Sequence, residues 1–175
     1  MARRKLISDV EVLDIALSLF ARDGEKGVSF GTVGKATGLA PATLVQRFVS
    51  SEALFSAMIS QSWTNATVVI QRCDEAMVPN GQNAVAFLKG LEQEVLAMPM
   101  GALLVASRQN PILRAKASDW RRAVEASLQG RIEKRPNQAA ESAAALFAAW
   151  QGRLLWSATE GGEFRLRAIL KKKLG

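Results

Sequence analysis

The chain has 175 residues, 49% of them hydrophobic, and its 23 Lys and Arg against 16 Asp and Glu give a formal net charge of +7. These totals predict a globular protein with a buried core and favour an anionic partner such as nucleic acid or an acidic membrane surface. Histidine is absent and Cys73 is the only cysteine, which excludes an intrachain disulfide and leaves zinc sites and histidine-dependent catalysis without their usual residues. We therefore expect a cytoplasmic protein with no metal and no cofactor.

The amino-terminal stretch is basic and then apolar, as in a signal peptide, but Asp9, Glu11 and Asp14 interrupt its apolar part. Later apolar runs such as MGALLVA are shorter than the roughly 18 residues that a membrane-spanning helix needs. The sequence thus predicts neither export nor a membrane span, and among anionic partners we expect DNA and no membrane.

Helical periodicity runs through almost the whole chain, so we predict an all-α fold of about nine helices. Ser8 and Glu11 have the spacing of a capping box at the start of the first helix, and Gly24 is placed to end it. The predicted buried stripe of this helix, at positions i, i+3, i+4 and i+7, consists of Leu13, Ala16, Leu17 and Phe20.

The next two helices form a helix-turn-helix in outline. One runs from about Phe30 to Thr37 with Ser29 as its cap, and the other starts at Pro41, where a missing N–H costs no helical hydrogen bond. In the turn between them Gly38 can adopt a positive φ, and Gly34, one helical turn earlier, lets a neighbouring helix approach closely.

A fourth, long helix is predicted from about Ser51 to Ala76, before the break at Pro79-Asn80-Gly81. We place the domain division along it, between a first domain of residues 1–50 and a second, helical domain of residues 51–175. The remaining predicted helices are Asn83–Leu96, Met100–Gln109, Ile112–Lys134, Gln138–Thr159 and Glu163–Lys173.

Between about Leu6 and Ser60 the chain carries a long, gapless series of recognisable features. They are Ala16, Phe20, Gly24, Val33, Lys35, Gly38, Thr43-Leu44, Phe48 and Ser50-x-Glu52-x-Leu54. This segment resembles the DNA-binding domain of the TetR family of transcriptional regulators. The resemblance implies an all-α homodimer that pairs through its last two long helices, with a DNA reader in the first three helices and a small-molecule effector bound in the rest of the chain.

The segment also departs from the family pattern around its third helix. The family typically has tyrosine at Val45 and often lysine at Ser51, and those two residues usually hold phosphates. Ala40 replaces a capping Ser or Thr, Pro41 replaces a basic residue, and Val49 replaces a proline. Because phosphate contacts supply much of the affinity for DNA, we expect weak or salt-sensitive binding.

Helical geometry indicates which side chains of the third helix remain for reading DNA. With Leu44 and Phe48 as the buried pair, steps of about 100° per residue direct Ala42 and Gln46 outward, place Thr43 and Val45 on the flanks, and bring Arg47 nearer the edge. Gln46 is suited to adenine and the methyl groups of Ala42, Thr43 and Val45 to thymine, while Arg47 could bind guanine or a phosphate. We therefore predict half-sites that contain A·T pairs.

Other residues are candidates for phosphate contacts. Arg3, Arg4 and Lys5 precede the first helix, and they form either an arm that reaches DNA or a disordered, solubilising tail. The remaining candidates are Ser29 and Thr32 near the start of the second helix, Lys35 in the same helix, and Ser51 at the start of the fourth.

Apolar and aromatic residues in the second half of the chain favour a ligand pocket. An ordinary helical core requires the same spacing of apolar residues, and we expect most of these residues to belong to the core. The candidates are Trp63, Phe87, Leu91, Leu103, Arg108, Trp120, Phe147 and Trp150. Arg108 would orient a polar ligand end, so the expected ligand is hydrophobic and either uncharged or anionic. The alanine-rich run AAESAAALFAAW fits either a subunit interface or the core of a monomer.

Three classes of function follow from these features. The first is a ligand-responsive repressor that binds a palindromic operator as a homodimer. The second is a helical ligand-binding or partner-binding dimer with a weakened DNA reader. The third is an enzyme, against which the absence of any recognisable catalytic spacing among the carboxylates argues.

Overall fold

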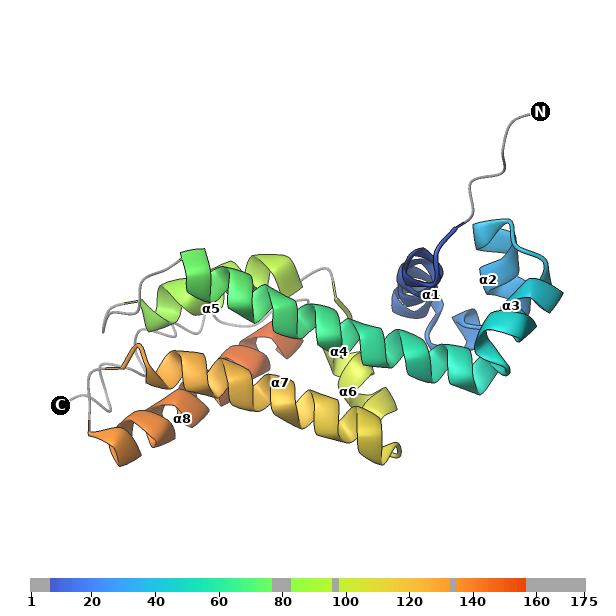
Figure 1. Cartoon of the computed structure of the whole chain (residues 1–175). Coiled ribbons are helices and arrows are strands. Elements are labelled where there is room, and N and C mark those ends of the chain that lie inside the picture. Colours follow the sequence, from blue (N-terminus) through green and yellow to red (C-terminus); the bar gives the residue numbers. More distant parts are fainter. Residues whose placement is uncertain (1–6, 77–82, 96–97, 133–134, 157–175) are drawn as a thin grey trace. The chain divides into compact units, whose positions relative to one another are not determined.

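The computed structural model describes residues 7–76, 83–95, 98–132 and 135–156. These residues form eight α-helices and a short 3₁₀-helix and contain no strand, which confirms the predicted all-α class. Figure 1 shows the helices in chain order. The ninth predicted helix, Glu163–Lys173, and the predicted break at Pro79-Asn80-Gly81 lie outside the described residues.

The chain divides into two compact units, one made of residues 1–65 and 98–117 and the other of residues 66–97 and 118–175. Helices α4 (Ser51–Ala76) and α7 (Pro111–Gln129) each contribute residues to both units. The domain boundary expected after residue 50 stays a prediction.

Helix α1 (Asp9–Asp23) begins at the predicted capping box. The Ser8 backbone N–H donates to Glu11 Oε2 at 2.8 Å, and the Glu11 backbone N–H donates to Ser8 Oγ at 3.2 Å. The helix ends at Gly24, whose φ is +69° and whose N–H donates to the Phe20 carbonyl at 2.9 Å.

The buried side of α1 is turned slightly from the predicted stripe. Val12, Leu13, Ala16 and Phe20 are buried, whereas Leu17 is only half-buried. At about 100° per residue the four buried positions fall within an arc of roughly 100°, and Leu17 lies about 40° beyond its edge. The prediction was therefore right for Leu13, Ala16 and Phe20, wrong for Leu17, and it missed Val12.

A 3₁₀-helix (Glu25–Gly27) leads into α2 (Phe30–Thr37), and a turn then leads into α3 (Pro41–Phe48). Ser29 caps α2, since its Oγ accepts the Thr32 backbone N–H at 3.1 Å, and Gly38 ends it with a φ of +72°. A Cβ added to Gly34 would lie 2.8 Å from the Leu39 carbonyl oxygen. The helix-turn-helix is therefore confirmed, and its turn packs tightly against the Gly34 backbone.

The rest of the first unit is organised around the first half of α4. Figure 1 shows α1, α2 and α3 gathered beside its first turns. The rings of Phe20 and Phe55 meet edge to face with centroids 5.4 Å apart. Further along, Trp63 Nε1 donates to Ser107 Oγ at 2.9 Å, which ties α4 to α6 (Met100–Ser107). These contacts join α1 and α6 to α4 within the first unit.

The second unit contains α5 (Ala84–Val95), α8 (Pro136–Trp156) and parts of α4 and α7. Its core includes a cluster of Trp120, Phe147 and Trp150, with ring centroids 5.8 to 6.4 Å apart. The ends of the helices differ from those predicted: α7 ends at Gln129 rather than near Lys134, and α8 starts at Pro136 rather than at Gln138. Proline is favoured in the first turn of a helix, so Pro136 begins α8 instead of preceding it.

One arginine of the second unit is buried. Arg131, whose side chain is 2% exposed, has Nη1 placed 2.9 Å from Asp74 Oδ1, and the same Nη1 donates to the Ser127 carbonyl at 2.9 Å. The Arg131 guanidinium carbon also lies 4.7 Å from the centroid of the Phe87 ring. These contacts link α4, α5 and the end of α7 through one charged group.

Candidate nucleic-acid interface

Helix α3 is fixed in the first unit by its predicted buried pair. Leu44 and Phe48 are both buried, and α2 packs against both α1 and α3. Because these two residues are one helical turn apart, they set which side of α3 faces inward. The opposite side of α3 remains available for a partner.

The exposed side of α3 is the one that the helical geometry predicts. Ala42, Val45 and Gln46 are exposed, with Val45 46% exposed, whereas Thr43 is half-buried. Within the part of the chain that the structure describes, the Gln46 amide has no hydrogen-bond partner. The exposed surface therefore combines several methyl groups with one unengaged amide.

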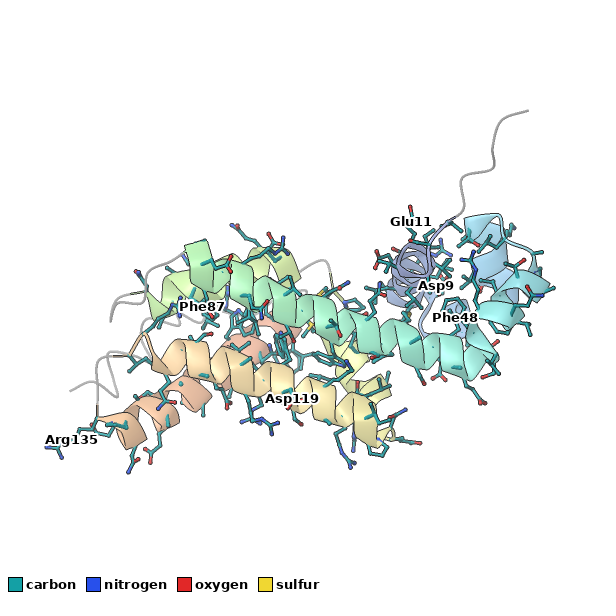
Figure 2. The ribbon with its side chains drawn as sticks, in the orientation of Figure 1. Asp9, Glu11, Phe48, Phe87, Asp119 and Arg135 are labelled. Atoms are coloured by element: carbon teal, nitrogen blue, oxygen red, sulfur yellow. The ribbon has the colours of Figure 1, made fainter. Side chains whose placement is uncertain are left out.

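Arg47 is not part of the exposed side of α3 but contacts the residues at the start of α1. Its Nη1 donates to the Ile7 carbonyl at 2.8 Å and lies 3.2 Å from Asp9 Oδ1, and its side chain is only 19% exposed. Figure 2 shows Asp9 at the start of α1 and Phe48 at the end of α3. Arg47 thus fixes the entry to α1, and reaching a guanine or a phosphate would require it to leave both partners.

The predicted phosphate contacts near α2 have different surroundings. Ser29 and Thr32 form a reciprocal cap, and the Thr32 hydroxyl also donates to the Gly27 carbonyl at 2.7 Å, so both hydroxyls are engaged within the protein. Lys35 is exposed and Ser51 is half-buried at the start of α4. Arg3, Arg4 and Lys5 lie outside the described residues.

The link between α3 and α4 contains a feature that the sequence did not predict. Val49 has φ +66° and ψ −53°, and the Ser50 backbone N–H donates to the Phe48 carbonyl at 2.7 Å, which closes a three-residue turn. Val49 is the only non-glycine residue with positive φ among the described residues, and it is 80% exposed. A proline, which the family resemblance leads one to expect here, could not adopt this φ.

The predicted ligand-binding residues are divided between the two units. Trp63, Leu103 and Arg108 belong to the first unit, where the tryptophan and the leucine are buried and the arginine is exposed. The buried members in the second unit are Phe87, Leu91, Trp120, Phe147 and Trp150. Their burial agrees with the expected core role, and their use by a ligand stays a prediction.

The described residues contain neither a candidate metal site nor a helix that could span a membrane. No three His, Cys, Asp or Glu side chains among them are grouped so that they could hold a metal ion. None of the helices formed by these residues is both long and apolar enough to cross a membrane.

Known proteins share this arrangement of helices. A TetR transcriptional regulator from Legionella pneumophila is 19% identical, with 97% of each chain covered and a TM-score of 0.71. E. coli NemR in its reduced form is 17% identical over 94% of each chain, with a TM-score of 0.68. PfmR, a TetR family regulator from Thermus thermophilus, is 16% identical over 93% of this chain and 94% of its own, with a TM-score of 0.65.

No protein-family model and no curated protein matches the chain. At the identities of the three structures the likeness establishes the fold. The chain has the all-α fold of TetR-type regulators, as the amino-terminal resemblance implied.

Proposed function

We propose that the chain is a DNA-binding transcriptional regulator of the TetR type. In this proposal it binds a palindromic operator as a homodimer, acts as a repressor in the cytoplasm, and is released from DNA by a small molecule. The exposed side of α3 is the observation behind the proposal. In a fold shared with regulators, Gln46 and Val45 lie on the exposed side of the second helix of a helix-turn-helix whose turn packs tightly. No catalytic role is assigned to any residue.

Gln46 is the proposed base-reading residue. A glutamine amide can donate and accept at once, which matches the N6 and N7 pattern of adenine in the major groove. Ala42, Thr43 and Val45 add the methyl groups around it. Arg47 does not belong to the proposed base readers, because it is bonded to Ile7 and lies beside Asp9.

Lys35 and the arm of Arg3, Arg4 and Lys5 are the proposed sources of phosphate binding. Lys35 is exposed on α2 next to the reader helix. Arg47 Nη1 donates to the carbonyl of Ile7, the first described residue after this arm. Each phosphate contact contributes a slope of about −0.9 to the dependence of log affinity on log salt.

Pairing of two subunits is proposed through the last two long helices. In α8 the buried Ala139, Ala143 and Leu146 pack within the second unit, whereas Ala140 and Ala148 are exposed. Small exposed side chains allow a second helix to approach closely. In one conformation of the dimer the two DNA-binding domains would be spaced incorrectly for the operator. A ligand that binds this conformation more tightly would lower the affinity for DNA, and the size of the effect is set by the difference in its affinity for the two conformations.

A second candidate function is a ligand-binding or partner-binding dimer with a weakened reader. The internal contacts of Arg47 favour it, as do Val45 and Ser51 at positions where the family usually holds phosphates. In this case the chain would bind DNA weakly and without regard to sequence.

Selection of random duplexes by the purified full chain, at low and at physiological salt, distinguishes the two functions. The proposed regulator enriches a palindrome with A·T pairs in each half-site and retains it at physiological salt. Sequence-blind binding that disappears with salt would instead establish the weakened reader and overturn the proposal.

A further inference from the structure

The exposed side of α3 is unusually uniform in its chemistry. Ala42 and Val45 present methyl groups, Gln46 carries the only side-chain amide of the helix, and no carboxylate is present. The one cation of the helix, Arg47, is directed to Ile7 and Asp9. This surface can therefore distinguish base edges through methyl contacts and one amide, without a charge aimed at guanine.

We propose that operator recognition depends on thymine C5-methyl groups contacted by Val45. The inference rests on the proposed function and identifies the chemical group that is read. Among the four unmodified bases only thymine offers a methyl group in the major groove, and an apolar side chain is its natural partner. Val45 places two methyl groups, with the side chain 46% exposed, beside the Gln46 amide that would select adenine.

The position of Val45 supports this role over a role in folding. A β-branched residue is a weak helix former, and its usual compensation is packing against neighbours. Val45 is exposed, one residue after the buried Leu44. Val68 in α4 is another exposed valine, also 46% exposed, but it lies outside the helix-turn-helix. It is therefore a matched control for the effects of exposure and branching.

The test uses the palindrome obtained by selection and versions of it in which deoxyuridine replaces thymidine at one position per half-site. This replacement removes the C5-methyl group and leaves Watson–Crick pairing and the O4 acceptor unchanged. At the thymine beneath Val45 we expect the full chain to lose about fourfold in affinity for each methyl group, and about fifteenfold for the symmetric pair. Fluorescence anisotropy with labelled duplexes measures both losses.

Two substitutions identify the protein side of the contact. In Val45→Ala the loss of affinity on replacing thymidine by deoxyuridine should be much smaller than in the unsubstituted chain, because the two γ-methyl groups of Val45 are gone. In Val68→Ala the full loss of affinity on replacing thymidine by deoxyuridine should remain. Equal losses in Val45→Ala and in the unsubstituted chain would overturn the assignment to Val45.

The outcomes separate this inference from the proposed function. A palindrome that is selected but binds equally well with deoxyuridine at every thymine overturns the methyl-reading inference and leaves the regulator in place. Failure to select any palindrome overturns the regulator and the inference with it. The same result is expected if the exposed side of α3 serves a protein partner instead of DNA.

Discussion

Replacing Val49 with glycine should stabilise the protein, although it removes a side chain. Val49 adopts φ +66° and ψ −53°, a conformation that a β-branched residue rarely occupies, and it closes the turn between α3 and α4. Strain of this kind costs about 1–3 kcal/mol, and glycine adopts positive φ without that cost. Relief of the strain is the favourable part of the expected change.

Two smaller effects oppose it. Glycine increases the conformational entropy of the unfolded chain, which costs about 0.5–1 kcal/mol. The loss of side-chain burial is small because Val49 is 80% exposed. Only about a fifth of the roughly 1.5–3 kcal/mol that a fully buried valine side chain contributes is therefore lost. With strain near the middle of its range, the free energy of unfolding should rise by about 1 kcal/mol and Tm by about 2–4 °C.

The assay is urea and thermal unfolding of the full chain, followed by far-ultraviolet circular dichroism. Val68→Gly is the control, since Val68 is an exposed valine in the regular α4 helix, where glycine should destabilise by about 1 kcal/mol. The same substitution should therefore raise the free energy of unfolding at position 49 and lower it at position 68. A loss of stability in Val49→Gly equal to that in Val68→Gly would refute the strain argument.

Three further predictions concern the interior of the two units. Gly34→Ala should lower the free energy of unfolding by about 1–3 kcal/mol, because the added Cβ would lie 2.8 Å from a backbone oxygen. Gly31→Ala in the same helix is the control and should not destabilise the protein. Chemical denaturation of both variants checks this prediction. Asp74→Ala should destabilise by about 3 kcal/mol because it leaves the buried Arg131 guanidinium without its carboxylate. Adding Arg131→Met should recover part of that loss, and equal instability of the single and double variants would contradict the pairing. Burial raises the pKa of the Cys73 thiol, so the native state holds this proton more tightly than the unfolded state, and stability should fall as pH rises above the ordinary thiol pKa of about 8.5. Denaturation across that pH range should show a shallower decline in Cys73→Ala, and an unchanged slope would count against the burial effect.

Local sequence signals predicted the starts and ends of the first helices correctly. The Ser8 and Glu11 capping box, the Ser29 cap and the positive φ of Gly24 and Gly38 all depend on residues within a few positions of one another. Their geometry follows from hydrogen bonding and sterics that the neighbouring sequence contains. The helix-turn-helix could therefore be recognised before the structure was known.

Features that depend on distant residues could not be predicted in the same way. Arg47 lies 40 positions from its partner Ile7, so its apparent availability on a helical wheel gave no warning of its internal contacts. The burial of Val12, with Leu17 only half-buried, depends on how the other helices pack against α1, which local periodicity does not contain. The positive φ of Val49 runs against its residue type, and only the path from α3 into α4 accounts for it.

Base discrimination by Gln46 is the most direct test of the proposed reader. The affinities of the unsubstituted chain and of Gln46→Ala should be measured for the selected palindrome and for a version with one A·T pair per half-site changed to G·C. The unsubstituted chain should discriminate by about 1–3 kcal/mol at that pair, and Gln46→Ala should lose most of this preference. Gln71→Ala, which alters an exposed glutamine of α4, should keep it. An unchanged preference in Gln46→Ala at every position of the palindrome would contradict the assignment of α3 as the DNA reader.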